Sequence, residues 1–283
     1  MVNNTASAKQ LIEDQVKGIL VEPLEAASVV LNAGPTVFNS SEPLRLKTLE
    51  EGFEPGIVGE GELIPDGGEA SFGEIKLMPT ERKSIKTIIR VSNELIRQST
   101  IGVSATLQAR LVKDVAAKLD NELLAGTGLD ETDQPNDGIL GLINQPDLAS
   151  TPMDLTDTDW ALDALASLAA KEITPNRFIL NGTDFFELRK LKDADGRYIV
   201  NGGPAEGAPY KLFEIPVTIT NKLVRGKGIL ANMNDVAVVR DIDPQVTILT
   251  ERYAEYDQIG IRVATRYDLG LLRKDSVLLL ETA

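Results

Sequence analysis

Apolar residues recur every four positions between residues 104 and 125, and this is the clearest pattern in the chain. They share one face of a predicted helix: Leu107, Leu111, Val115, Leu119 and Leu123. The predicted polar flank is largely charged: Arg110, Lys113, Asp114, Lys118, Asp120 and Glu122. Gly126 follows where helices commonly end with a glycine. At 1.5 Å per residue such a helix is about 33 Å long, so we predict a spine helix at 104–125.

The remaining pattern mixes short helices and strands. Apolar spacings of three and four across residues 8–33 predict an N-terminal helix that ends or kinks at Pro23, and this segment either packs on its own domain or reaches a neighbour. Helices are also predicted at 159–172 and 184–191. Strands are predicted at 85–91, 177–180, 213–220, 228–231, 236–240, 246–250, 259–265 and 276–280. Because strands and helices do not alternate regularly, the pattern predicts an α+β fold.

Residues 48–75 form an acidic, glycine-rich segment without Lys or Arg. Its carboxylates include Glu60, Glu62 and Glu69. Glycine favours turns and open backbone, and like charges disfavour compact packing of the segment on itself. The composition predicts an extended hairpin loop at 50–75 that projects from the body, and an unstructured surface loop fits it equally well.

The charge reverses in the next segment, 76–97. Its basic residues include Lys76, Arg82, Lys83 and Lys86. Alternating β-branched residues predict the strand at 85–91, and Ser92 is a natural N-cap for a following helix. The segment is either a solvated face or a surface that meets an acidic segment within the chain or across a subunit boundary. For the second interpretation, the candidate contact residues are Glu60, Glu62, Glu69, Lys76, Arg82, Lys83 and Lys86.

Charge and composition narrow the possible functions. The formal net charge is −14, and residues 119–170 contain acids but no Lys or Arg. This balance argues against a protein whose main task is to grip DNA or an anionic membrane, because that task needs a basic face. The chain contains no His and no Cys. Ser-His-Asp triads, thiolate nucleophiles and His- or Cys-bearing metal sites are therefore excluded.

No motif for a cofactor, a metal or catalysis stands out. The glycine pairs at 59–61 and 126–128 do not continue into a phosphate-binding loop and lie among carboxylates. The acidic residues at 130–138 miss the spacing of a calcium-binding loop. A catalytic carboxylate pair stays open, with 43 acids in the chain. The first ten residues lack the features of a signal peptide and no stretch is long and apolar enough for a membrane span, so we expect a protein made and kept in the cytoplasm unless it leaves within a larger particle.

The order of these features resembles the major capsid proteins of tailed bacteriophages. A Val-Ser-Asn-Glu-Leu turn at 91–95 leads toward the spine helix, which ends in Leu-Leu-Ala-Gly-Thr-Gly at 123–128. Pro135 and a Gly-Ile-Leu run at 138–140 follow, as in that family. Residues 215–217, Ile-Pro-Val, are similar to a family strand, although Glu214 replaces its usual glycine. The resemblance runs from about residue 15 to the C-terminus.

The resemblance implies a phage-capsid fold and a structural role. It implies an N-terminal arm (1–32), an extended loop (50–75), a peripheral domain (33–49, 76–150 and 236–265) and an axial domain (151–235 and 266–283). The implied function is self-assembly of hexamers and pentamers into an icosahedral head shell around double-stranded DNA, without sequence-specific binding. Implied partners are a scaffolding protein, a portal and possibly cement proteins. The shell would assemble in the bacterial cytoplasm and end in the virion, with no cofactor, no catalytic residue and no membrane.

Two departures from the family and two alternatives accompany this interpretation. Some relatives cross-link neighbours through a loop Lys and an Asn in the terminal sheet, yet no Asn follows Asn234 here, so we expect noncovalent shells. Some carry a long N-terminal scaffolding region, whereas about 30 residues precede the body, so scaffolding is supplied separately or already removed.

An encapsulin-like bacterial nanocompartment shares the fold and is the first alternative function. A carboxylate-dependent soluble enzyme is the second.

Overall fold

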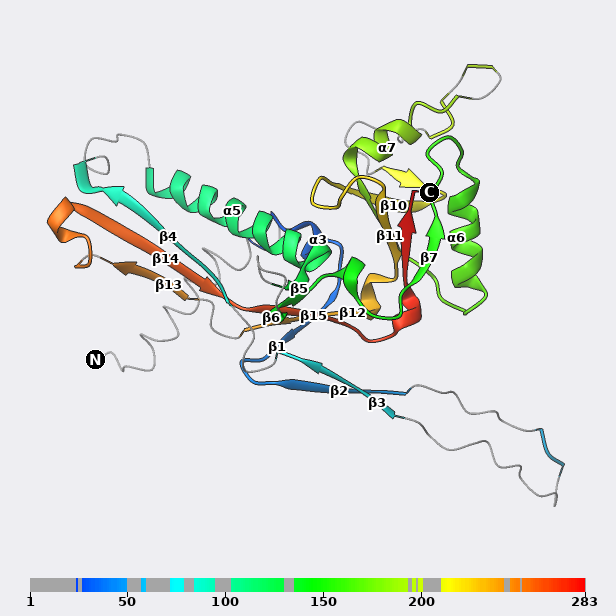
Figure 1. Cartoon of the computed structure of the whole chain (residues 1–283), viewed down its shortest axis with the longest axis horizontal. Coiled ribbons are helices and arrows are strands. Elements are labelled where there is room, and N and C mark those ends of the chain that lie inside the picture. The colour runs from blue at the N-terminus through cyan, green and yellow to red at the C-terminus, as the bar shows by residue number, and fades with distance from the viewer. Residues whose placement is uncertain are drawn as a thin grey trace, which may run out of the picture.

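The computed structural model shows an elongated subunit built along one long helix (Figure 1). The residues that it describes are 24, 27–49, 57–59, 72–78, 84–94, 103–129, 135–192, 195–196, 198–200, 210–241, 245–249 and 251–282. The helix is α5 (Val103–Ala125), which confirms the predicted spine. Its buried side chains are Leu111, Val112, Val115, Ala116, Leu119, Leu123 and Leu124. They form the centre of the largest hydrophobic core.

Gly126 ends α5 because two backbone segments meet there. Its N–H donates to the Glu122 carbonyl at 2.9 Å. A β-carbon on Gly126 would lie 2.4 Å from the carbonyl oxygens of Glu122 and Ile139. Ile139 belongs to β6 (Pro135–Leu140), which pairs with β5 (Thr127–Leu129) and precedes the 3-10 turn η2 (Leu142–Asn144). Close approach therefore requires glycine at this position.

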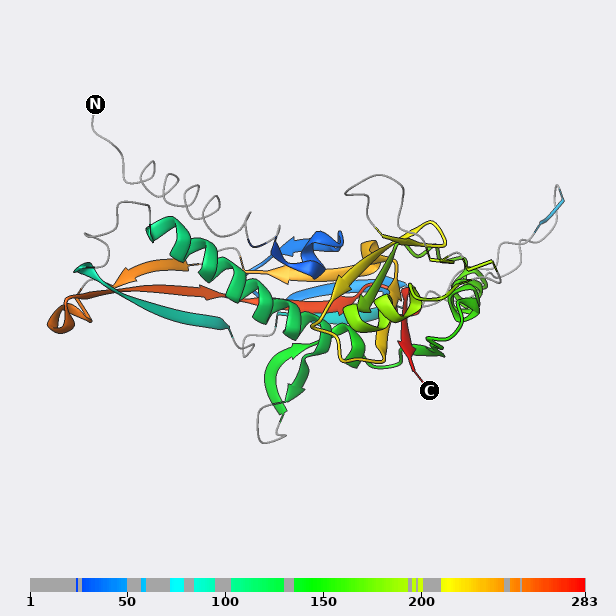
Figure 2. The same cartoon turned by 90° about the horizontal axis from the view of Figure 1, so that it is seen from above.

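A three-stranded antiparallel sheet lies against α5. Its order is β13 (Gln245–Leu249), β14 (Gln258–Thr265) and β4 (Ile85–Ser92), and η4 (Ala254–Tyr256) lies between β13 and β14. Figure 2 shows α5 lying across this sheet. Ile85 and Ile89 of β4 join the core beneath the helix, whereas Lys86, Ile88 and Arg90 are exposed on the other face. This alternation gives the sheet one apolar face and one basic face.

A second three-stranded sheet continues the same core. In it β1 (Thr36–Asn39) pairs in parallel with β12 (Val236–Arg240), and β12 pairs antiparallel with β15 (Tyr267–Leu271). One face of β12 enters the core of α5 through Val238, and the other contacts Leu77 and Met78 through Val239. The 3-10 turns η3 (Met233–Asp235) and η5 (Lys274–Ser276) flank β12 and β15.

The base of the projecting loop is a paired hairpin. β2 (Leu44–Leu49) and β3 (Phe72–Leu77) form an antiparallel ladder with six residue pairs, from Leu44 opposite Leu77 to Leu49 opposite Phe72. The segment between the strands spans residues 50–71, and the loop was predicted at 50–75. Within it the structure describes 57–59, which lie far from the folded body (Figure 1). Glu60, Glu62 and Glu69 lie outside the described residues.

The smaller lobe is built on a six-stranded sheet. Its order is β7 (Ala149–Pro152), β16 (Val277–Glu281), β11 (Lys227–Ala231), β8 (Arg177–Asn181), β10 (Ile215–Thr220) and β9 (Lys211–Leu212). The lobe also contains α6 (Asp159–Ala169) and α7 (Gly182–Leu188). Its separate core contains Trp160, Phe178 and Phe185, with an edge-on contact between the Trp160 and Phe178 rings. The mixed sheets and helices confirm the α+β class.

Several predicted boundaries were wrong for local reasons. The helix predicted at 8–33 does not run unbroken to residue 33, because Ser28 is extended and begins α3 (Val29–Asn32) as its N-cap. Pro23 lies outside the described residues. The helix predicted at 159–172 ends at Ala169. The strand predicted from residue 213 begins at Ile215, because Phe213 and Glu214 have positive φ angles of 46° and 66° and form a turn.

Candidate subunit-contact surfaces

The predicted basic segment is divided between two sheets. Lys76 lies on β3 in the hairpin base and Lys86 lies on β4 beside β14, while Arg82 and Lys83 lie outside the described residues. The Lys76 ammonium is 3.9 Å from the Glu74 carboxylate, and Arg45 shares that carboxylate at 3.3 Å. Lys76 and Lys86 carry the same charge and belong to one basic segment of the sequence, yet they lie on different surfaces.

The outer face of β4 and β14 carries cations without anionic partners. Lys86, Arg90 and Arg262 form no ion pair within the described part of the chain. The Arg262 Nη2 approaches the Thr247 hydroxyl at 3.4 Å, and its Nε is buried without a hydrogen-bond partner there. Ile88 lies opposite Arg262 in the ladder and is exposed. This face can accept a surface that is acidic and partly apolar.

One end of this basic face is organised around Tyr253. The Arg90 guanidinium lies 4.8 Å from the ring centroid, and that of Arg252 lies 5.7 Å from it. Such contacts are worth about 0.5–1 kcal/mol at exposed sites. A β-carbon on Gly260 would come within 2.7 Å of the ring. Glycine in β14 therefore lets the Tyr253 ring, which both arginines approach, come close to the strand.

Two buried aspartates attach outlying segments to the body, and the sequence analysis missed both. Asp120 is 3% exposed and accepts hydrogen bonds from the Ser28 hydroxyl at 2.5 Å and the Val29 N–H at 2.9 Å. The prediction that Asp120 belongs to the polar flank was wrong. The available signal was that Asp120 follows Val112 and Ala116 at intervals of four residues, on the side of the helix where both are buried.

The second buried aspartate, Asp268, lies at the root of the hairpin. It is 0% exposed and accepts the Met78 N–H at 2.6 Å. Met78 has a φ of +55°, an uncommon value for a residue other than glycine. The carboxylate satisfies the N–H of this strained residue where β3 ends. Asp268 therefore links the end of the β2–β3 hairpin to β15.

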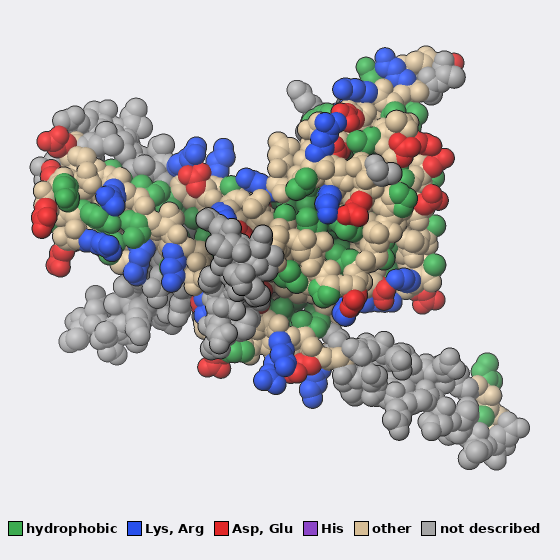
Figure 3. Space-filling model, in the orientation of Figure 1, with side chains coloured by type: hydrophobic (Ala, Val, Ile, Leu, Met, Phe, Trp, Pro, Cys, Tyr) green, Lys and Arg blue, Asp and Glu red, His purple; other side chains and the backbone are tan. Residues whose placement is uncertain are grey.

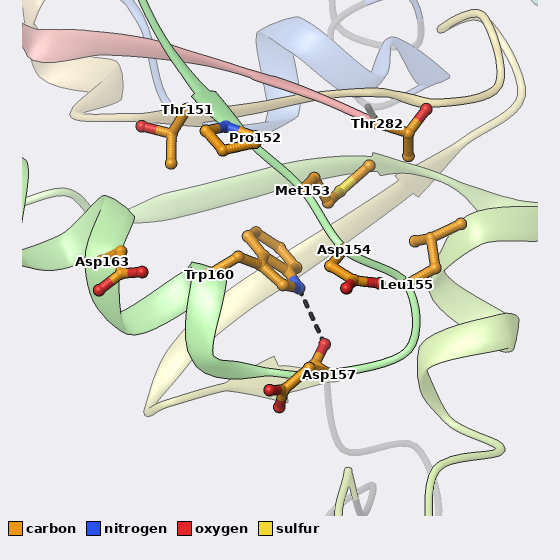
Figure 4. A pocket seen from close by; sticks show the side chains of 9 residues that line it. All are labelled: Thr151, Pro152, Met153, Asp154, Leu155, Asp157, Trp160, Asp163 and Thr282. Atoms are coloured by element: carbon orange, nitrogen blue, oxygen red, sulfur yellow. Dashed lines mark hydrogen bonds between the residues drawn. The ribbon is translucent and has the colours of Figure 1, made fainter.

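A cavity of about 830 Å³ opens beside α6 in the smaller lobe (Figure 4). Asp154, Asp157 and Asp163 line it around Trp160, whose indole N–H donates to the Asp157 carbonyl at 3.1 Å. The backbone N–H and the hydroxyl of Thr156 both donate to Asp154 and lower the pKa of its carboxyl. These carboxylates form no ion pair within the described residues, so this side of the lobe is acidic.

A third buried aspartate stabilises the α7 side of the same lobe. Asp184, in the first turn of α7, accepts the Gly226 N–H at 2.6 Å and lies 3.3 Å from the Arg225 guanidinium. Glu187 contacts the same guanidinium at 2.7 Å, and its hydrogen bond is the main cause that raises the pKa of Arg225. Arg225 is thereby committed to intramolecular partners.

The described ranges contain no group of three or more acidic side chains arranged to hold a metal ion. Among the helices that the structure describes, none has the length and apolar character required to cross a bilayer.

Comparison with known proteins identifies the fold. The chain is 24% identical over 252 residues to the major capsid protein of Enterobacteria phage HK97, covering 87% of this chain and 62% of that protein. It therefore spans less than two thirds of the length of that relative.

Solved structures share its architecture along most of both chains. The capsid of an empty GTA particle, computed with C5 symmetry, superposes with a TM-score of 0.67 at 17% identity over 90% of each chain. A structure of Microbacterium phage Oxtober96 gives a TM-score of 0.69 at 16% identity, over 90% of this chain and 91% of the other. The sequence pattern of the phage capsid family matches residues 9–282. Because this match spans nearly the whole chain, the chain belongs to the phage capsid family.

Proposed function

We propose that this chain is a major capsid protein, which self-assembles into the icosahedral head shell of a tailed bacteriophage with double-stranded DNA. The family match over residues 9–282 is the observation that carries the proposal. The fold shared with the GTA capsid along 90% of both chains supports it. The family is a structural one, and the relatives described above give no support to the encapsulin-like alternative.

The two cores support a division into peripheral and axial domains. The peripheral domain contains α5 with residues 33–49, 76–150 and 236–265, and the axial domain contains the six-stranded sheet with residues 151–235 and most of 266–283. The pairing of β15 with β12 favours assigning residues 267–271 to the peripheral domain. In the assembled shell, the axial domains would gather around the centre of each capsomer.

The acidic loop of one subunit contacts the basic strand of its neighbour in this proposal. The loop contributes Glu60, Glu62 and Glu69, and the basic side contributes Lys76, Arg82, Lys83 and Lys86. The absence of an ion pair for Lys86 within the described residues supports the contact. Complementary charge fixes the register of such contacts more than it adds affinity.

The remaining partners follow from a shell that encloses a genome. They are a scaffolding protein, a portal and cement proteins, with assembly in the host cytoplasm and a final location in the virion. The net charge of −14 fits a lining that does not bind the packaged DNA tightly. No Asn follows Asn234, so neighbours would be joined without the covalent cross-link of some relatives.

Electron microscopy with light scattering on the purified protein tests the proposal. The expected result is capsomer rings, sheets or closed shells, formed alone or with a crowding agent. The mass of the subunit is 30.6 kDa. A monomer of that mass under every condition, including co-expression with candidate scaffolding proteins, would contradict the proposal.

A further inference from the structure

Three large aromatic side chains on or near α7 and β9 are exposed in the smaller lobe. Phe186 of α7 is 48% exposed, Tyr198 is 51% exposed and Phe213 is 42% exposed. The Phe186 ring lies 6.4 Å from that of Tyr210, which directly precedes β9 at the end of the sheet. Exposed apolar patches on soluble proteins mark binding surfaces. We name this surface the aromatic edge.

The turn that presents Phe213 is strained. Phe213 and Glu214 connect β9 to β10, and both have positive φ. Two-residue hairpin turns of this kind strongly prefer Gly, which lacks a β-carbon, or Asn and Asp, whose short polar side chains tolerate the left-handed region that other residues disfavour. Strain of this kind persists where the surrounding structure holds it, and it clusters at functional positions. The strained turn keeps a phenyl ring on the surface.

Basic side chains surround the aromatic edge. The Lys192 ammonium lies 4.8 Å from the centroid of the Tyr198 ring, and the Arg189 guanidinium lies 4.9 Å from that of Tyr210. Lys190 is exposed. Within the described residues Lys190, Lys192 and Arg189 form no ion pair. Figure 3 shows the basic side chains gathered at the top of this lobe, around α7 and the turn that follows it.

The outer side of α6 has the opposite charge on the same lobe. Asp159 and Asp163 are exposed there without ion pairs to other described residues, and Leu162 between them is 47% exposed. Figure 3 shows acidic side chains along the edge of the lobe that α6 occupies. We name Asp159, Leu162 and Asp163 the acidic face. It offers two anions and one apolar contact, which complement the cations and rings of the aromatic edge.

We propose that the acidic face of one copy binds the aromatic edge of a second copy of this chain. Charge complementarity between two surfaces of one lobe carries the proposal, and it rests on self-assembly as the proposed function. Because the two surfaces differ, the contact is head-to-tail, and its repetition by a constant rotation closes a ring. Aromatic and basic side chains at the centre of such a contact supply its affinity, and the carboxylates set its register.

Charge reversal of each surface tests the proposal. One variant carries Lys190→Glu with Lys192→Glu, and the other carries Asp159→Lys with Asp163→Lys. Each variant alone places like charges across every contact, so the protein concentration needed for ring formation rises by at least about tenfold. Mixed in equal amounts, the two variants restore opposite charges across every contact between unlike copies. The mixture therefore forms rings with an even number of subunits, which native mass spectrometry and electron microscopy detect.

Two further variants complete the design. Lys113→Glu, at an exposed lysine on α5, is the control. It changes the net charge by as much as Lys190→Glu alone, and this variant should form rings like the wild type. Phe213→Ser removes the projecting ring and should weaken ring formation without lowering the thermal stability of the subunit. Circular dichroism establishes that every variant is folded.

The outcomes separate the two proposals. If the wild type forms no ring or shell with any scaffold or crowding agent, the proposed function fails and this inference fails with it. If the wild type assembles and both charge-reversal variants assemble equally well, self-assembly stands and the contact is refuted. Failure of the mixture to recover, with both variants folded, also refutes the contact.

Discussion

The aspartates at the root of the projecting segments and those along α6 show two uses of the same residue. Asp120 and Asp268 are buried, and each accepts backbone N–H groups from a distant segment. Asp159 and Asp163 are exposed and have no ion partner within the described residues. A buried carboxylate stabilises the subunit because its donors would otherwise be unsatisfied, whereas an exposed one contributes little to folding. The difference separates charges that hold the subunit together from charges that remain available to a neighbour.

The largest expected effect on subunit stability comes from Asp120→Ala. This change leaves the Ser28 hydroxyl and the N–H groups of Val29 and Val30 without their acceptor. The free energy of unfolding should fall by about 3 kcal/mol, since hydrogen bonds to charged groups are each worth about 1.5–3 kcal/mol. Urea denaturation measures it. Asp163→Ala is the matched control and should change stability by less than about 0.5 kcal/mol. Equal losses of unfolding free energy in the two variants would contradict the distinction between buried aspartates that stabilise the subunit and exposed ones that do not.

Asp268→Ala should cost somewhat less, about 2 kcal/mol, because most of the hairpin ladder stays paired. Its effect should also be local. Hydrogen exchange of the Met78 amide and of β3 should accelerate more than exchange in α5. Uniform acceleration across the subunit would show that the carboxylate acts on global stability and does not specifically attach the hairpin.

Glu214→Gly should raise stability by about 0.5–1 kcal/mol. Relief of the positive φ is worth about 1–2 kcal/mol, and the greater freedom of glycine in the unfolded chain offsets part of it. Thermal unfolding measures the change. The aromatic ring of Phe213 stays in this variant, so ring formation should persist. A loss of stability would indicate that the Glu214 side chain stabilises the fold by more than the backbone strain at this position destabilises it.

Arg82→Glu with Lys83→Glu should leave subunit stability within about 0.5 kcal/mol of the wild type, because the proposal assigns both side chains to a contact with the neighbour and not to the fold of the subunit itself. Assembly should be impaired, since the proposed neighbour loop is acidic. Light scattering during assembly and urea denaturation of the same sample measure the two effects. Normal shells from this variant would refute the role of the basic segment in subunit contact.

The smallest effect is a change in the pKa of Asp154. Its pKa is lowered by the backbone N–H of Thr156 and then by the Thr156 hydroxyl. A lowered folded-state pKa stabilises the fold above the unfolded pKa, near 3.8, and this contribution is lost as the pH falls through the folded value. Thr156→Val removes the hydroxyl and should raise the pKa part of the way back. Titration of the carboxyl carbon by NMR measures the shift, and an unchanged pKa would contradict the assigned cause.

Local patterns in the sequence predicted the parts of the fold that depend on local contacts. The spine helix was found because its apolar period persists over five residues from Leu107 to Leu123. Eight strands of six residues or fewer were missed as separate elements: β1, β2, β3, β5, β6, β7, β9 and β15. One of them, β1, pairs with β12 about 200 residues later. Pairing over such separations leaves little local signal.

The sequence predicted the charge of the candidate contact surfaces but not where these surfaces lie in the fold. The acidic and basic segments were recognised from composition, yet Lys76 and Lys86 occupy different sheets. The aromatic edge escaped notice because Phe186, Tyr198 and Phe213 are separated along the chain. The replacement of a family glycine by Glu214 was visible in the sequence, and the strained turn is its structural consequence.

The link between Met78 and Asp268 also determines how the subunit carries mechanical load. If a neighbour pulls on the projecting loop, tension runs down β2 and β3 and enters the body at their roots. At the β3 root the hydrogen bond to Asp268 passes this force to β15, and from there to β12 and the core beneath α5. Because the β12–β15 ladder does not depend on this bond, release of the β3 root would leave that ladder paired.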